Sequence, residues 1–321
     1  MIFSRTAISL SFLLLITSCA TTNNKNQDQL IFDATINKNM NTTMDAIRNG
    51  KYSDAEIKII AQKAIENNLC TLAYVITSEY QLSPNFHSEH QTLFQCLMLN
   101  KEFTSALSIL QQGANPDFIK EANYERNDAL EEAAAWGEIG IVEELLKLGK
   151  RPSNKAFYVG ISGHYHSDYE KSLKFFELFK PFIVTIDLNH SFAQKPLLYE
   201  VLVERKYNLA QRLQLAKLLL ENGADPNAGI QKTVHGSELS INYTETAFMA
   251  VKGAPELTAL LLAHGANPKF EIYKDKAYFL ASLKRGDIVS QGIILDFKNS
   301  LILVQEENGQ RWMTIEQIDP V

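Results

Sequence analysis

The stretch "DALEEAAAWGEIGIVEELLKLG", residues 128–149, decides the fold that this sequence predicts. Its first half carries small residues, Ala133 and Ala134, which allow a helix to pack closely against its neighbours. Its second half carries an aliphatic stripe at helical spacing, formed by Ile141, Val142, Leu145 and Leu146. Gly149 follows, and the left-handed conformation that ends many helices favours glycine. The stretch therefore predicts two consecutive helices that end at a glycine.

Three further segments repeat the end of this stretch: "SILQQGANPDF", "KLLLENGADPNA" and "ALLLAHGANPKF". Their glycines, Gly113, Gly223 and Gly265, lie 36, 74 and 116 residues from Gly149. Because 74 residues correspond to two steps, we expect a degenerate repeat between Gly149 and Gly223, with Thr185 in place of the glycine. One step before Gly113 we expect another degenerate repeat, with Gln81 in that place. The Asp-Pro or Asn-Pro after the glycine predicts a turn, since proline fixes φ and the Asx side chain caps the backbone.

These segments resemble the ankyrin repeat, over about residues 42–270. The best copy departs from the family pattern at Glu131, where the family has histidine. The resemblance implies a mainly α ankyrin-repeat solenoid, residues 41–280, with about six repeats. One repeat cannot bury its own apolar face, so the repeats must stack. The resemblance also implies that the chain binds another protein through its concave surface and finger loops.

The step from Gly223 to Gly265 is roughly nine residues longer than a 33-residue ankyrin unit. The extra residues lie in "GIQKTVHGSELSINYTET", part of which alternates like a strand. They predict either a long finger hairpin or a tolerated surface insertion. Trp136 falls on the concave side in the family's layout. There it would either anchor a partner or cover the next repeat. The candidate partner-binding residues are Trp136, Asp225, Asn227, Glu238, Tyr243 and Asn267.

The last part of the chain, residues 281–321, loses the helical pattern. Short β-rich runs are separated by turn signals, of which Asn308-Gly309 is the strongest. The run Gly286-Asp287-Ile288-Val289 resembles the first strand of an SH3-like barrel. We therefore expect a small β-barrel-like segment that packs on the last repeat and caps it.

The first residues, "MIFSRTAISLSFLLLITSCA", carry an early Arg5 and then a short apolar run, as secretory signals do. Ile16-Thr17-Ser18-Cys19 resembles the lipobox of bacterial lipoproteins. The resemblance implies that residues 1–18 are removed, that Cys19 carries fatty acids, and that residues 19–40 include a polar tether. It implies the bacterial cell envelope, with Ala20 favouring the outer membrane and a periplasmic face. A plain signal or a short membrane anchor is the alternative.

The two other cysteines, Cys70 and Cys96, would face an oxidising compartment, which permits a disulfide. Cys96 occupies a helix-core position in "TLFQCLML", where a small buried thiol is the commoner state. The sequence therefore favours free thiols.

The segment "HYHSD" resembles the H-x-H-x-D core of a metallo-hydrolase site, with His164, His166 and Asp168 as weak candidate ligands. Tyr169 follows where such a site would need a further histidine, so we expect a polar turn between two helices. The net charge of −6 and the absence of a basic run argue against nucleic acid. No nucleotide-binding or zinc-finger motif is present.

These observations predict a non-enzymatic protein without a cofactor or a small-molecule substrate, whose partner is another protein. One hypothesis is an immunity protein that blocks a basic toxin aimed at the periplasm. A second is an envelope scaffold or stress-protection protein, and a metal-dependent hydrolase is the least favoured.

Overall fold

The computed structural model describes residues 40–50, 52–117, 127–203, 206–251, 253–298 and 301–319. The predicted signal peptide, the lipobox with Cys19 and the tether up to residue 39 lie outside the described residues. In the described part, no helix has both the length and the apolar character needed to cross a membrane. The chain divides into two compact units, one of residues up to 133 with 140–150, the other of 134–139 with the residues from 151 onward.

The first unit consists of antiparallel helices that bury one apolar face. Its helices are α2 (Met40–Asn49), α3 (Asp54–Glu66), α4 (Cys70–Glu79), α5 (Leu93–Leu99) and α6 (Phe103–Gln111). Two further helices, α7 (Ala129–Trp136) and α8 (Ile139–Lys147), run across the division. A capping box between Ser53 and Glu56 begins α3, and Ile60, Ala61 and Ala64 then fall on its fully buried face.

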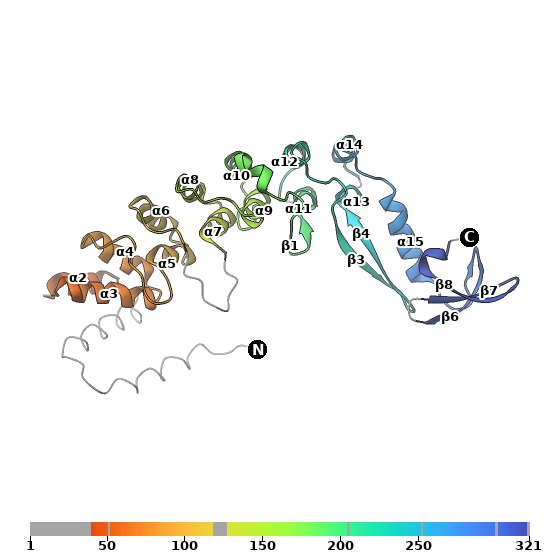
Figure 1. Cartoon of the computed structure of the whole chain (residues 1–321), viewed down its shortest axis with the longest axis horizontal. Coiled ribbons are helices and arrows are strands. Elements are labelled where there is room, and N and C mark those ends of the chain that lie inside the picture. Colours follow the sequence, from red (N-terminus) through yellow and green to blue (C-terminus); the bar gives the residue numbers. More distant parts are fainter. Residues whose placement is uncertain are drawn as a thin grey trace, which may run out of the picture. The chain divides into compact units, whose positions relative to one another are not determined.

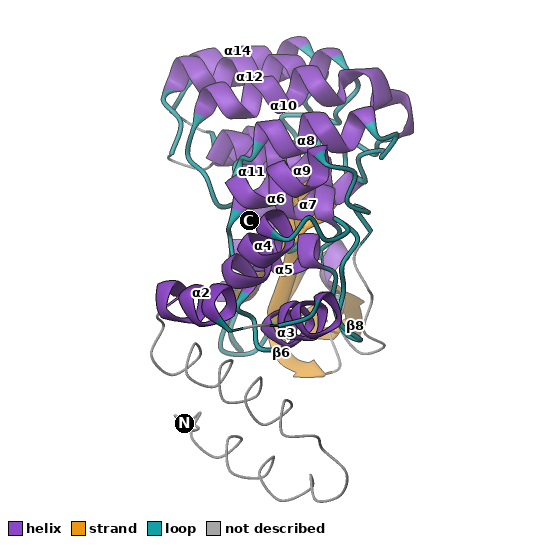
Figure 2. Ribbon diagram, turned by 90° about the vertical axis from the view of Figure 1, so that its left-hand side faces the viewer, coloured by secondary structure: helices purple, strands orange, loops and turns teal. Residues whose placement is uncertain are grey.

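The second unit continues with three helix pairs, α9 with α10, α11 with α12, and α13 with α14. The first helices are α9 (Asn154–Ser162), α11 (Leu197–Val203) and α13 (Ala247–Ala250). The second helices are α10 (Tyr169–Phe179), α12 (Leu209–Glu221) and α14 (Pro255–Ala263). In Figure 1 the second helices form one row and the first helices another, and Figure 2 shows α10, α12 and α14 side by side. The stripe of α12 buries Leu215 and Leu219 completely.

Two antiparallel finger hairpins extend from the turns of this unit. The short one pairs β1 (Ser191–Phe192) with β2 (Lys195–Pro196). The long one pairs β3 (Gly229–His235) with β4 (Ser240–Thr246) over seven residue pairs. The hairpin that was one of two predictions for the extra residues 229–246 is therefore confirmed.

The helix ends follow the predicted glycine spacing with one exception. Gly113, Gly223 and Gly265 have φ values of 95°, 101° and 90°, and Gln81 takes the same left-handed conformation with φ 50°. Thr185 does not, because α10 continues as the 3-10 helix η2 (Lys180–Thr185). The helical segment still ends at Thr185, as the predicted degenerate repeat requires, and an Asx turn at Asp187 follows it.

Asx side chains connect the turns in a ladder of hydrogen bonds. Within a turn, the first Asx accepts from the backbone N–H two residues later, as Asp225 does from Asn227 at 2.8 Å. Between turns, the second Asx accepts from the next turn's first backbone N–H. These bonds join Asn85 to Asn115 (2.6 Å), Asn154 to Asp187 (2.8 Å), Asn189 to Asp225 (2.7 Å) and Asn227 to Asn267 (2.7 Å). Asp117 is the second Asx of the turn that follows Gly113. Asp117 instead forms an ion pair with Lys150.

Cys70 of α4 and Cys96 of α5 form a disulfide, with Cα atoms 5.6 Å apart. The sequence favoured free thiols, and this prediction was wrong. The helix-core position of Cys96 was correct, since both cysteines are buried, but the two helices face each other at these residues.

The chain continues with α15 (Phe270–Ser282) and a small antiparallel sheet of four strands in sequence order. The strands are β5 (Ile288–Val289), β6 (Gly292–Lys298), β7 (Leu301–Glu306) and β8 (Gly309–Thr314), and the 3-10 helix η3 (Ile315–Gln317) follows. One hydrogen bond from the Ser290 N–H to the Asp319 carbonyl, 3.2 Å, brings residues beyond η3 back to the end of β5. The small β segment is confirmed, and its likeness to an SH3-like barrel stays a prediction.

The sheet shares one hydrophobic core with α15, the long hairpin and α13. Ile302 and Val304 of β7 are fully buried in it, together with Leu280 of α15 and Ile241 of β4. Met249 of α13 belongs to the same core. The segment predicted to cap the last repeat therefore reaches it through α15 and the hairpin.

Candidate partner-binding surfaces

Trp136, the candidate anchor, lies at the end of α7 and stacks on Tyr165, which belongs to the turn between α9 and α10. The ring centroids are 4.6 Å apart and the ring planes are inclined by 27°. The Tyr165 N–H donates to the Ala135 carbonyl at 3.0 Å, which fixes the turn against the end of α7. Tyr165 remains 53% exposed. The "HYHSD" turn and Trp136, which the sequence presented as separate features, therefore form one surface.

The aromatic contacts continue from Tyr165 to the short finger. The His164 ring lies 4.4 Å from Tyr165 and 5.4 Å from Phe192 of β1, both in edge-on geometry. The Lys155 ammonium lies 5.6 Å above the Phe192 ring. We call Trp136, Tyr165, His164 and Phe192 the aromatic strip. Large, stiff rings of this kind provide contact area at a small loss of conformational entropy, and they are enriched among interface anchors.

The structure does not bring the three candidate metal ligands together. Asp168 is the N-cap of α10, where one carboxylate oxygen accepts from the N–H groups of Glu170 (3.0 Å) and Lys171 (3.3 Å). His166 turns inward against Phe175, with ring centroids 5.8 Å apart, while His164 joins the aromatic strip. Among the described residues, no three His, Cys, Asp or Glu side chains are placed to hold a metal ion. The segment is the polar turn between α9 and α10 that the sequence favoured.

Both histidines of this turn are shifted toward the neutral form. Burial lowers the pKa of His166 below its ordinary value, and the nearby Lys171 and Lys206 lower it further. Burial lowers the pKa of His164 in the same way, with Lys206 and Lys155 adding to the effect and Glu200 opposing it. At neutral pH the aromatic strip therefore carries an uncharged imidazole.

The remaining candidate residues divide into three groups. Glu238 is exposed at the tip of the long hairpin, between β3 and β4. Asp225, Asn227 and Asn267 belong to the Asx ladder, where each side-chain oxygen accepts from a backbone N–H. Tyr243 is only 8% exposed and packs in the shared core beside Tyr278, with ring centroids 6.2 Å apart. Burial raises the pKa of the Tyr243 hydroxyl to about 12, and the Glu245 carboxylate adds to the shift.

Sequence reasoning missed a polar cluster that fixes the long hairpin. The Tyr199 hydroxyl of α11 donates to the Glu245 carboxylate of β4 at 3.0 Å. The ammonium groups of Lys232 and Lys274 each lie 3.8 Å from the same carboxylate. Burial first, and then the charge of Glu245, raises the pKa of the Tyr199 hydroxyl well above its ordinary range. The four residues belong to different elements and form no sequence motif. Only the register of the hairpin could have indicated that they meet, and the sequence does not specify that register.

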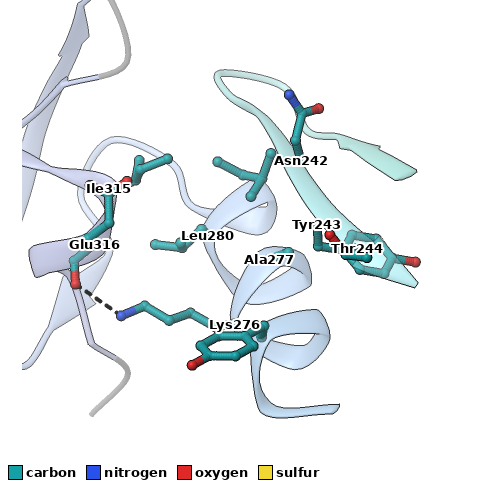
Figure 3. Close-up of a pocket in the computed structure, with 10 residues that line it drawn as sticks. Asn242, Tyr243, Thr244, Lys276, Ala277, Leu280, Ile315 and Glu316 are labelled. Atoms are coloured by element: carbon teal, nitrogen blue, oxygen red, sulfur yellow. Dashed lines mark hydrogen bonds between the residues drawn. The ribbon is translucent and has the colours of Figure 1, made fainter. Parts of the chain in front are cut away.

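A pocket of about 400 Å³ opens between the long hairpin, α15 and η3 (Figure 3). Its floor is apolar, and its rim carries amide, hydroxyl, ammonium and carboxylate groups. The lining residues are Ile241, Asn242, Tyr243, Thr244, Tyr273, Lys276, Ala277, Leu280, Ile315 and Glu316. The sequence indicated only Tyr243 among them.

Helix pairs ended by left-handed glycines, Asx turns and finger hairpins together define an ankyrin-repeat array. Solved ankyrin-repeat structures are similar to parts of the chain. The ankyrin repeat domain ABAYE2397 from Acinetobacter baumannii AYE covers 67% of this chain and 100% of its own, with 18% identity and a TM-score of 0.44. The human ASB11 ankyrin repeat domain covers 74% and 98%, with 14% identity and a TM-score of 0.43. The ankyrin repeat protein EF0377 covers 66% and 98%, with 17% identity and a TM-score of 0.41.

No protein-family model matches the sequence, and no curated protein matches it either.

Proposed function

We propose that this chain is a non-enzymatic protein-binding array of the bacterial cell envelope, tethered through a lipid on Cys19 and facing the periplasm. The array itself supports the binding role, because stacked repeats present an extended surface that is assembled before any partner arrives. The proposed mechanism is complementarity of shape and charge with exclusion of water, and no bond is made or broken.

The observation that carries the proposal is the stack of Trp136 on Tyr165. A tryptophan at the end of a first helix is held in one orientation by an exposed tyrosine ring. An anchor that is already ordered loses little entropy when the partner binds. The aromatic strip extends this surface to the short finger, so the partner would contact both a helix end and a finger.

Two independent features support the proposed location in the bacterial cell envelope. The lipobox-like Ile16-Thr17-Ser18-Cys19 supports lipid attachment in the envelope. The Cys70–Cys96 disulfide supports an oxidising surrounding, because structural disulfides are rare in reducing cytosol. Neither feature depends on the other.

Within this role we favour an immunity protein that binds and blocks a toxin delivered to the periplasm. The net charge of −6 would favour a basic toxin through electrostatic steering. The alternative is an envelope scaffold or stress-protection protein. Deletion in cells grown alone separates the two, since a scaffold predicts a defect and an immunity protein predicts none until the toxin is present.

The binding role is tested by capturing the partner from envelope extracts with the full-length protein in mild detergent. The affinity of the captured partner is then measured for wild type, Trp136→Ala and Trp312→Ala. Trp312 is the matched control, because it is the chain's other tryptophan, 41% exposed on β8 and outside the aromatic strip. We expect Trp136→Ala to weaken binding by roughly tenfold or more, and Trp312→Ala to leave it unchanged. Equal affinity of wild type and Trp136→Ala would show that the anchor is wrongly chosen.

The tether is tested separately by growing cells with a fatty-acid analogue and detecting the label on the protein. We expect label on wild type and none on Cys19→Ser. An unlabelled wild-type protein would refute the lipoprotein assignment and leave the binding role standing.

A further inference from the structure

The pocket between the long hairpin, α15 and η3 lies along the free edge of β4. Ile241 and Tyr243 point to one face of this strand, and Asn242 and Thr244 to the other, as their alternating burial shows. All four line the pocket. Successive residues from both faces of a strand can line one pocket only if it meets the strand at its edge, where the backbone groups project.

That edge of β4 carries backbone groups without a strand partner. Pairing with β3 uses the other edge over its whole length. Within the described ranges, no hydrogen bond joins the backbone of residues 241–244 to any segment except β3. An unpaired row of N–H and C=O groups is a template for another extended chain.

The floor beside the edge is apolar and has room for side chains. Ala277 and Leu280 of α15 form its centre, and Ile315 of η3 forms its far side (Figure 3). The volume of about 400 Å³ is that of a small-ligand site. Four residues of β4 span roughly 14 Å, so the pocket admits a short extended segment rather than a globular surface.

The η3 end of the pocket is negatively charged. The Lys276 ammonium donates to the Glu316 carbonyl and to the Asp319 carboxylate, both at 3.1 Å. The Glu316 carboxylate is exposed, and a hydrogen bond from Thr314 lowers its pKa, so it stays ionised. This end of the pocket therefore carries the exposed Glu316 carboxylate as well as the Asp319 carboxylate that Lys276 binds, and a cationic side chain complements the net negative charge.

We propose that β4 and this pocket bind an extended segment of the protein partner by strand addition, with its apolar side chains at alternate positions and a lysine or arginine at the η3 end. Main-chain hydrogen bonds to the β4 edge fix the segment's direction, and the apolar floor selects every second side chain. The proposal rests on the proposed protein-binding function and adds a second contact, separate from the aromatic strip.

The probes are capped, fluorescently labelled six-residue peptides in which valine and threonine alternate and lysine stands at one end. Two versions, with lysine at either end, cover both strand directions. Controls replace lysine by glutamate or carry N-methyl groups on alternate residues, which remove backbone donors. Binding to the full-length protein in mild detergent is measured by fluorescence anisotropy.

We expect one lysine peptide to bind with a Kd below about 1 mM, and its N-methylated form to bind at least about tenfold more weakly. Glu316→Lys should weaken the lysine peptide roughly fivefold and favour the glutamate peptide. Glu307→Lys, an equal charge change in the exposed β7–β8 turn, should change neither. No binding by either lysine peptide, or equal binding by the N-methylated form, would overturn strand addition.

The two proposals fail separately. Trp136→Ala should leave peptide binding unchanged, because Trp136 does not line the pocket. If Trp136→Ala abolishes capture of the partner while no peptide binds wild type, the array binds its partner without the β4 edge. If a lysine peptide binds but Trp136→Ala retains the partner's affinity, the aromatic strip is not the anchor and the pocket remains.

Discussion

The side-chain oxygen of Asn189 accepts a hydrogen bond of 2.7 Å from the backbone N–H of Asp225, which lies 36 residues further along the chain. Asn227 forms the same bond with the N–H of Asn267 one repeat later. Each turn thereby fixes the start of the next, so the Asx residues couple neighbouring repeats as well as shaping their own turns. Stacked repeats depend on such nearest-neighbour terms for much of their stability.

Replacing Asn189 by alanine should therefore destabilise the protein, because the Asp225 N–H loses its acceptor. We expect a loss of about 0.5–1.5 kcal/mol in the free energy of unfolding, measured by urea denaturation. Asn189→Asp keeps an acceptor oxygen at the same place and should retain most of the stability. If the alanine and aspartate variants were equally stable, the ladder would not contribute to stability.

Much of the array could be predicted because turn chemistry is local. Glycine followed by Asx-Pro specifies a helix end and a turn whatever surrounds them, and Gly113, Gly223 and Gly265 behave as predicted. Thr185 does not take the left-handed conformation, because α10 runs on into the 3-10 helix η2, which ends there. Cys70 and Cys96 could not be paired from the sequence, since their distance depends on how α4 and α5 face each other.

The candidate site could be predicted only in part, for similar reasons. Trp136 was identified from its place in the repeat, but its partner Tyr165 belongs to an irregular turn that no repeat pattern describes. Tyr243 was expected at the surface. The alternation of "SINYT" places it on the same face of β4 as Ile241, which is a signal that could have shown its burial.

Gly236 at the tip of the long hairpin lies against the end of α15, and the contact leaves no room for a side chain. A methyl group at position 236 would overlap the Ala281 carbonyl oxygen, which is backbone and cannot rotate away. Gly236→Ala should therefore displace the hairpin tip and lower the free energy of unfolding by about 1–3 kcal/mol. Hydrogen exchange of the amides in residues 277–283 should become faster.

Ser237→Ala is the matched control for this change, since Ser237 is exposed at the same tip and its replacement adds no atoms. It should alter stability by less than about 0.5 kcal/mol. Unchanged exchange in Gly236→Ala would show that the hairpin tip and α15 do not depend on this close approach.

Stability should depend on pH through His166. Its pKa in the folded protein is lowered by burial, then by Lys171 and Lys206, while the Gly160 carbonyl and Asp168 act in the opposite direction. The unfolded chain therefore binds the proton more readily between the lowered value and the ordinary value of about 6.5. The stability that the neutral His166 contributes is fully present above about pH 6.5 and is lost as the pH falls toward the folded-state pKa.

The measurement is the urea midpoint at about pH 7.5 and about pH 5 for wild type and His166→Gln. Wild type should lose more stability than the variant on acidification. The urea midpoint of His166→Gln should still fall somewhat on acidification, because burial also lowers the pKa of His164. Combining His164→Gln with His166→Gln should reduce this pH dependence further. If the urea midpoints of wild type and both variants changed equally with pH, the pH dependence would not come from these histidines.

Reduction of the Cys70–Cys96 bond should destabilise the first unit. The bond closes a loop of 26 residues between α4 and α5, and the loss of this constraint on the unfolded chain corresponds to about 3–4 kcal/mol. Urea denaturation with and without reductant measures the difference, and Cys70→Ala combined with Cys96→Ala should be insensitive to reductant. Mass analysis after alkylation shows whether the bond forms in cells. If these cysteines are alkylated without reductant in protein taken from the envelope, the bond is absent there and the argument for an oxidising compartment loses its structural support.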